Sequence, residues 1–146
     1  MPRFSEVATT PIDDIKPPKP LCVGHYIFLV DGPPEFDSGI SQKTNEPYER
    51  YTVKCRPVKP GDDVDQGLLR DTLEGDKLAD RTINLAIFEP HVMVTFLQAC
   101  GIKGRMGEAV AQLPGKQFMA HVTHNPGQRD KTRLYANIEQ GTWTKA

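Results

Sequence analysis

The sequence lacks any long hydrophobic run. Its longest apolar stretches, residues 27–30 and 85–88, are of strand length, whereas an apolar helix needs about 20 residues to cross a bilayer. The first residues, MPRFSEVATT, contain no apolar core of the kind that directs secretion. We therefore expect a soluble, cytoplasmic protein that does not bind membranes.

Cysteine is scarce, and motifs of catalysis are missing. Cys22, Cys55 and Cys100 are far apart and odd in number, which favours reduced thiols in the cytosol over a disulfide framework. The chain also lacks a Gly-x-Ser-x-Gly nucleophile motif and a glycine-rich phosphate loop. We therefore expect neither enzymatic activity nor a cofactor.

A strong charge of one sign is also missing, because the net charge is −1. The distribution of charge is uneven, however. Residues 61–80 carry seven acidic and two basic side chains, a local net charge of −5, so the rest of the chain has a net charge of +4. A mildly basic body can accept an anionic ligand, although it does not require one.

The length of 146 residues and the hydrophobic content of 38% fit one globular domain. Residues 1–20 hold five of the 13 prolines, and proline fixes φ and lacks an amide donor. We expect these residues to form a flexible, extended arm. The predicted domain spans residues 21–141 and is followed by a short C-terminal tail, residues 142–146. In this tail Trp143 is expected to cap the core, and stacking on a base is the alternative.

Five segments have the pattern of β-strands: residues 22–31, 47–56, 82–89, 116–124 and 132–139. The second alternates most clearly, with Tyr51, Val53 and Cys55 on one face and polar residues on the other. Residues 32–46 have the composition of a loop. Helices are expected near residues 68–73, over 91–100 with Pro90 at the first position and Gly101 after the end, and near 107–113.

Three strands, a helical segment and two further strands make the arrangement of an OB-type barrel. The predicted fold is therefore all-β with a helical insertion: a five-stranded OB-type barrel with a helix between strands 3 and 4. An open β-sandwich is the alternative.

Such barrels bind oligonucleotides on the face of strands 2 and 3 and through the loops between strands 1 and 2 and between strands 4 and 5. Aromatic rings at these places can stack on bases while cations contact phosphates. The outward face of the second strand offers a ring with cations at alternate positions, and strand 5 repeats the pair. The candidate contact residues for single-stranded DNA are Phe36, Lys43, Tyr48, Arg50, Lys54, Arg56, Arg129, Lys131, Arg133 and Tyr135.

Four short motifs carry a resemblance to a known family. They are Gly24-His25-Tyr26, Asn45-Glu46-Pro47-Tyr48, Gly101-Ile102 and Gly115-Lys116-Gln117-Phe118. Over residues 20–140 the chain resembles phage-encoded OB-fold single-stranded-DNA-binding proteins. The resemblance implies sequence-tolerant binding of single-stranded DNA in replication or recombination, in the host cytoplasm, with replication or recombination proteins as partners and an oligomer as one option. The chain ends in QGTWTKA and not in the acidic tail of many bacterial relatives, which leaves recruitment by such a tail in doubt.

Two other readings compete with nucleic-acid binding. The first is a non-enzymatic structural or protein-interaction module, such as a small virion or assembly component. The second is a zinc-dependent enzyme, because Cys22-x-x-His25 and His121-x-x-His124 have ligand-like spacing. Residues three apart in a strand point to opposite faces, so we expect no metal site from these pairs. Asp62, Asp63 and Asp65 lack the spacing of a calcium loop and are expected in a solvated acidic loop.

Overall fold

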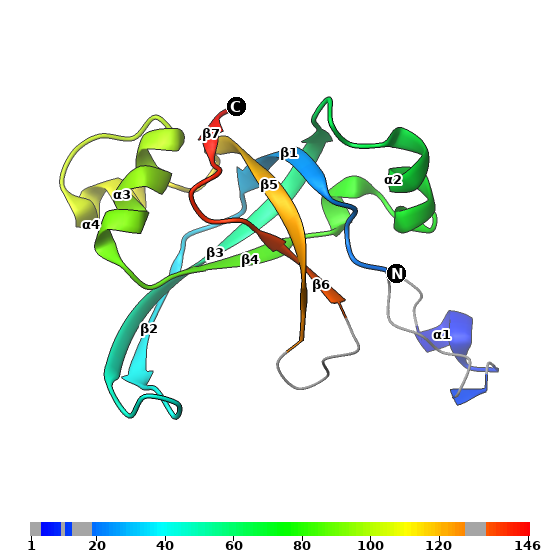
Figure 1. Cartoon of the computed structure of the whole chain (residues 1–146), viewed down its shortest axis with the longest axis horizontal. Coiled ribbons are helices and arrows are strands. Elements are labelled where there is room, and N and C mark those ends of the chain that lie inside the picture. The colour runs from blue at the N-terminus through cyan, green and yellow to red at the C-terminus, as the bar shows by residue number, and fades with distance from the viewer. Residues whose placement is uncertain (1–3, 10, 13–18, 128–133) are drawn as a thin grey trace.

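The computed structural model describes residues 4–9, 11–12, 19–127 and 134–146 (Figure 1). Strands make up most of the regular structure, and most of the helical residues come shortly before or shortly after the strand Ile83–Ile87 in the sequence. In chain order the elements are α1 (Phe4–Val7), β1 (Gly24–Val30), β2 (Glu35–Ile40), β3 (Pro47–Pro60), α2 (Gln66–Leu73), the 3-10 helix η2 (Leu78–Asp80), β4 (Ile83–Ile87), α3 (Pro90–Ala99), α4 (Met106–Ala111), β5 (Gln117–Pro126), β6 (Leu134–Ile138) and β7 (Thr144–Lys145).

The strands form one open, antiparallel sheet. β3 is long enough to pair with three strands: β2 and β1 share one of its edges, and β4 takes the other. The sheet continues from β1 to β5, which pairs with both β6 and β7. β4 and β6 approach each other without a ladder in the described part of the chain, and the Gln140 side-chain amide donates to the Ala86 carbonyl at 2.8 Å. The predicted all-β fold with a helical insertion is confirmed at this level.

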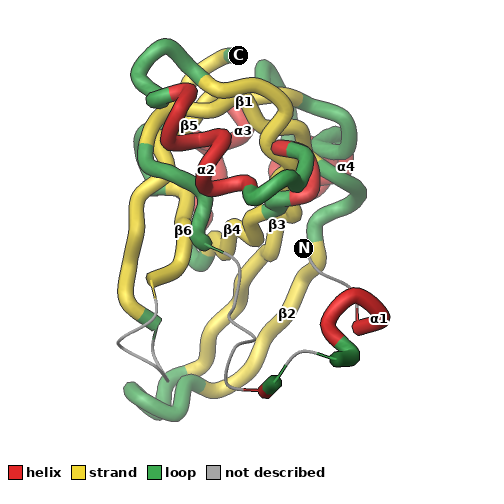
Figure 2. The backbone as a smooth tube through the Cα atoms, turned by 90° about the vertical axis from the view of Figure 1, so that its right-hand side faces the viewer, coloured by secondary structure: helices red, strands yellow, loops and turns green. Residues whose placement is uncertain are grey.

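Two hairpins extend from the sheet. The β2–β3 and β5–β6 hairpins point to the same side of the molecule, away from the C terminus, as the two perpendicular views show (Figures 1 and 2). Helices α3 and α4 follow β4 and lie on the opposite side from α2.

All five predicted strands are present, but two predictions near them are wrong. Residues 32–46 are not all loop, since they contain β2, and β3 continues past Pro57 to Pro60. No residue of β2 is buried, so its sequence shows none of the apolar alternation that marks a half-buried strand. Pro57 is tolerated because β3 has a bulge at this point of the ladder: Ile27 and Phe28 of β1 are opposite Lys59 and Pro57, which leaves Val58 as the extra residue. Proline in sheets is found at bulges.

The predicted helices are confirmed with small changes of boundary. The Asp65 carboxylate accepts a hydrogen bond from the Leu68 amide at 3.0 Å and so caps the N-terminus of α2. Pro90 begins α3, where its missing amide hydrogen costs nothing. Gly101 follows that helix with φ of +76°, a left-handed conformation that glycine adopts without steric cost.

The core lies between the inward faces of the strands and α3. Phe28 and Phe118 are fully buried and stack at 5.5 Å between ring centroids, and Phe96 of α3 meets Phe118 edge-on at 4.8 Å. Trp143 packs against Phe96, and its Nε1 donates to Thr95 Oγ1 at 3.0 Å. Trp143 therefore caps the core, as expected, and β7 extends the sheet past residue 141.

The end of β6 lies outside the core, and the three cysteines lie within it. Leu134 of β6 is 48% exposed, because the end of this strand projects with the hairpin. Cys22, Cys55 and Cys100 are buried, free thiols. Burial raises the pKa of the Cys55 thiol well above its ordinary value and that of Cys100 to about 12. The thiols of Cys55 and Cys100 therefore stay protonated near neutral pH.

Candidate nucleic-acid interface

The outward side chains of β3 lie on one face of the sheet. We define the β3 face as Tyr48, Arg50, Lys54 and Arg56 of β3 together with Phe88, which follows β4. The inward residues Val53 and Cys55 are fully buried, whereas those of the β3 face are exposed or half-buried. The ladder places Lys54 opposite Asn84, so alternate residues of β3 and β4 share this face.

Two aromatic rings meet on the β3 face. The rings of Tyr48 and Phe88 pack edge-on, with centroids 6.1 Å apart, and the Arg50 guanidinium carbon lies 5.9 Å from the Tyr48 centroid. Tyr48 is opposite Gly39 in the hairpin, where a Cβ would come within 3.1 Å of the Tyr48 hydroxyl. Glycine at this position lets the tyrosine ring lie flat across the neighbouring strand. Phe88 is 53% exposed and was not among the predicted contact residues, because its isolated apolar side chain at the end of a strand gave no signal.

Carboxylates pair with the cations of this face. Arg50 is 2.9 Å from Asp37, which is its cross-strand partner on β2. Asp31 forms ion pairs with two cations: its Oδ2 lies 2.6 Å from Arg56 Nη2 and 3.8 Å from Lys54 Nζ. The Arg56 hydrogen bond holds the pKa of Asp31 below its usual range. The sequence pattern showed the cations but not these partners, because Asp37 belongs to a segment that was predicted to be a loop and Asp31 is the last residue of the first predicted strand, whose neighbours the sequence does not reveal.

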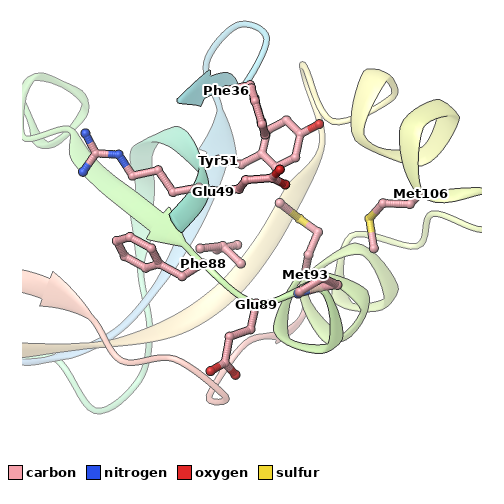
Figure 3. Close-up of a pocket in the computed structure, with 10 residues that line it drawn as sticks. Phe36, Glu49, Tyr51, Phe88, Glu89, Met93 and Met106 are labelled. Carbon is pink, nitrogen blue, oxygen red and sulfur yellow. The ribbon is translucent and has the colours of Figure 1, made fainter. Parts of the chain in front are cut away.

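Phe36 does not join the β3 face, contrary to the prediction. It is opposite Tyr51 in the ladder and meets its ring edge-on at 5.2 Å, on the other side of the hairpin. There it lines a pocket of about 230 Å³, whose other wall includes Met93 of α3 and Met106 of α4 (Figure 3). Arg50 and Phe88 of the β3 face also border this pocket. Glu49 contributes a carboxylate to this pocket. Phe36 and Tyr48 therefore lie on opposite faces of one hairpin.

The other predicted contact residues fall into two groups. Lys43 is exposed in the turn between β2 and β3, and Tyr135 of β6 is 40% exposed. Tyr135 lines an open cleft of about 360 Å³ between β4 and β6, together with Lys19, Arg81 and Asn84. Because Asn84 is also the cross-strand partner of Lys54, this cleft borders the β3 face. Arg129, Lys131 and Arg133 lie outside the described residues.

The two Cys/His pairs do not form the zinc site that was considered. The Tyr26 hydroxyl donates to the Cys22 carbonyl and lies 3.0 Å from the Cys22 thiol, while the His124 ring contacts the Leu21 carbonyl at 2.7 Å. His25 from the first pair instead contacts His121 from the second pair, and their ring centroids are 4.9 Å apart. Sequence spacing missed this contact because it lies across two strands rather than along one.

Asp63 joins these histidines, so the acidic segment is not simply a solvated loop. Its carboxylate accepts hydrogen bonds from the His25 backbone amide at 2.8 Å and the His25 ring at 2.7 Å. The bond from the ring is the main reason that the pKa of Asp63 lies below its usual range. His25, Asp63 and His121 each offer a ligand atom within 4.8 Å of the others, and they are the group in the described chain that could hold a metal ion.

Within the described chain, every helix is too short or too polar to cross a membrane. Neither the protein-family models nor the curated protein sequences contain a match to this chain.

Proposed function

We propose that the chain is an OB-type protein that binds single-stranded DNA along the β3 face, without catalysis. The observation that carries this proposal is the shared, exposed orientation of the ring pair Tyr48 and Phe88 and the cations Arg50, Lys54 and Arg56. Rings that stack on any base and cations that follow a backbone are the two parts of a sequence-tolerant single-strand site.

The strand order supports the barrel. Along the sheet the strands run β4, β3, β1, β5, β6, with the two end strands close to each other. A partly open five-stranded barrel has this arrangement, and β2 and β7 are additions to it. In such barrels the ligand lies on strands 2 and 3, here β3 and β4, between two loops. In this proposal the loops are the connections from β1 to β3 and from β5 to β6. The hairpins β2–β3 and β5–β6 project to the same side (Figures 1 and 2), which supports it.

The ion pairs on the β3 face affect how DNA binds. Asp31 and Asp37 hold the three cations while no nucleic acid is present. A phosphate of the DNA must replace a carboxylate as the partner of each cation. Breaking the existing ion pairs therefore offsets part of the favourable electrostatic free energy of binding. We therefore expect modest affinity that falls steeply with salt. The carboxylates also keep the cations ordered and pointing outward before binding.

The role follows from this chemistry and from the family resemblance. A small protein that covers unpaired DNA without reading its sequence serves replication or recombination, where single strands are exposed. Replication or recombination proteins are the expected partners, and self-association along the strand is compatible with such a role.

Titration with fluorescent oligo-dT tests the proposal. The double variant Arg50→Glu, Lys54→Glu should reduce the slope of log affinity against log salt concentration by about two, one for each lost phosphate contact. The matched control is Lys103→Glu, Lys145→Glu, which reverses two exposed charges, one after α3 and one in β7, a strand that pairs with β5, and should leave binding nearly unchanged. Equal affinity of the parent and the Arg50/Lys54 variant would remove the β3 face as the site.

The apolar pocket supports a second candidate function, the protein-interaction module. Phe36 is 55% exposed beside Tyr51 and the methionines of α3 and α4, and exposed apolar groups of this kind fit a protein segment. A gel shift at low salt separates the two functions. A shift with single-stranded oligonucleotides supports DNA binding, and the absence of any shift favours the interaction module.

A further inference from the structure

We propose that His25, Asp63 and His121 form a binding site for a divalent transition-metal ion, with Zn²⁺ as the best fit. This site is independent of DNA binding and uses different strands from those of the β3 face. Each of the three residues offers one ligand atom, and the three atoms lie within 4.8 Å of one another.

The sheet register brings the two histidines together. His25 of β1 is directly opposite His121 of β5 in the antiparallel ladder, and directly opposed residues have their Cβ atoms about 5 Å apart on the same face. Both rings point away from the core, because Tyr26 and Ala120 beside them are fully buried. The pair is therefore fixed by the backbone and does not depend on the chance position of two long side chains.

The turn after β3 brings in the carboxylate. The Gly61 amide donates to the His25 carbonyl at 2.7 Å, and the His25 amide donates to Asp63 Oδ1 at 2.8 Å. A Cβ at Gly61 would lie 2.8 Å from the His25 carbonyl oxygen, so the close approach of this turn requires glycine. The second carboxylate oxygen of Asp63 is 2.7 Å from His25 Nδ1.

A fourth residue orients the second histidine. Glu139 Oε2 is 2.9 Å from His121 Nδ1, and the Glu139 amide donates to the His121 carbonyl at 2.8 Å. With Nδ1 held in this way, His121 offers Nε2 to an ion. A carboxylate that accepts from the other ring nitrogen of a metal-binding histidine is the usual second partner of such ligands.

The distances allow an ion after small side-chain rotations. Zinc binds imidazole nitrogen at about 2.0–2.1 Å, so two ligand atoms on a tetrahedral ion lie about 3.3 Å apart. Zn²⁺ would take the place of the proton between His25 Nδ1 and Asp63 Oδ2. The neutral imidazole of His25 would then carry its proton on Nε2, and Nδ1 and Oδ2 would both become ligands. The side chains of His25 and Asp63 are 42% and 48% exposed, which leaves them room to move and leaves a fourth position open to water.

The ligand set selects the class of ion. Two imidazoles and one carboxylate suit zinc and neighbouring transition metals, whereas Ca²⁺ and Mg²⁺ prefer all-oxygen sites. A bound ion would link β1, the turn before α2 and β5, three segments that are far apart in sequence. Its first effect is therefore to hold the acidic segment against the sheet.

Calorimetric titration of the tag-free, EDTA-treated chain with ZnCl₂ tests the site. We expect one equivalent per chain, and loss of measurable binding in the double variant His25→Ala, His121→Ala. Glu139→Gln should weaken binding by about tenfold, in the range known for second-shell partners. The matched control is His91→Ala, whose ring is 78% exposed beside Glu89 and which should bind Zn²⁺ like the parent. Absence of binding at millimolar ZnCl₂, or unchanged binding by the double variant, would overturn the proposal.

A measurement on the unmodified chain avoids the risk that a variant misfolds. In ¹⁵N NMR spectra of the histidine rings, ZnCl₂ should shift the signals of His25 and His121 and leave those of His91 and His124 in place. Shifts confined to His91 or His124 would place the ion elsewhere and would refute the site.

Discussion

The imidazole rings of His25 and His121 lie 4.9 Å apart because the β1–β5 ladder sets the two residues directly opposite each other. Each ring also has its own carboxylate, Asp63 for His25 and Glu139 for His121. Two histidine–carboxylate pairs from four separate segments thus meet at one place on the sheet. The turn that carries Asp63 depends on a single close backbone contact, which leads to the first prediction.

Gly61→Ala should destabilise the fold by about 1–3 kcal/mol, the usual cost of forcing an extra carbon into a packed site. The new Cβ would lie 2.8 Å from the His25 carbonyl oxygen, a backbone atom that cannot rotate away. Urea denaturation followed by circular dichroism measures the change. Gly107→Ala is the matched control, because its Cβ would meet nothing within 4 Å and alanine favours the helix, with a gain of up to about 1 kcal/mol. Equal stability of the Gly61 variant and the parent would show that the turn is not held in this way.

Trp143→Ala should cost about 3–5 kcal/mol, as for other large core side chains. Trp143 is 6% exposed against Phe96, so truncation leaves a cavity above α3. Trp143→Phe keeps most of this packing but loses the bond to Thr95, and should cost about 1 kcal/mol. Circular dichroism is the suitable probe, since the chain contains one tryptophan and the variants remove it. Thr144→Ala, at an exposed neighbour, should change stability by less than about 0.5 kcal/mol.

Much of the fold could be predicted from the sequence because burial leaves a pattern. The alternation of Val53 and Cys55, the strand expected over residues 82–89 and the Pro90 start of α3 each reflect one buried face or one helix start, and each is confirmed. β2 could not be predicted, since no residue in it is buried. Its structure comes from pairing with β3 alone, which leaves no hydrophobic signal.

The candidate site was predicted in part, for a similar reason. Period two along β3 was enough to place Tyr48, Arg50, Lys54 and Arg56 on one face. Phe36, Phe88 and the pairing of Asp37 with Arg50 depend on which strands are neighbours and in which register, and a single sequence does not carry this information. The histidine pair was missed on the same ground, because ligand spacing was sought along each strand and the contact lies across two.

Asp31→Asn should make the stability of the protein less sensitive to acid. The Arg56 hydrogen bond keeps the pKa of Asp31 in the folded chain below its unfolded value, which is about 3.9. This pair therefore stabilises the fold fully above pH of about 4, and the contribution is lost as the pH falls through the lower, folded pKa. The variant should be less stable than the parent at neutral pH, and the difference should shrink below pH 4.

Chemical denaturation at a series of pH values measures this difference. Asp71→Asn controls for the loss of one negative charge, because the Asp71 side chain is 74% exposed and lies 3.6 Å from Lys19. Exposed pairs of this kind contribute little to stability. A difference between Asp31→Asn and the parent that persists unchanged at low pH would mean that the charge of Asp31 is not what stabilises the fold.

Phe88→Leu should weaken oligo-dT binding, whereas Phe36→Leu should not. Stacking of a base on an aromatic side chain is worth about 1–3 kcal/mol, which is roughly a 5- to 150-fold change in affinity. Both rings are exposed to a similar extent, 53% and 55%, and both substitutions keep an apolar side chain. Both border the pocket beside α3 and α4, but they differ in their ring partners: Phe88 meets Tyr48 on the β3 face, and Phe36 meets Tyr51 on the other side of the hairpin. The comparison therefore separates a site on the β3 face from a general effect of surface aromatics. Equal loss of affinity in both variants would argue that DNA passes over both faces of the hairpin, and loss in Phe36→Leu alone would move the site to the pocket beside α3 and α4.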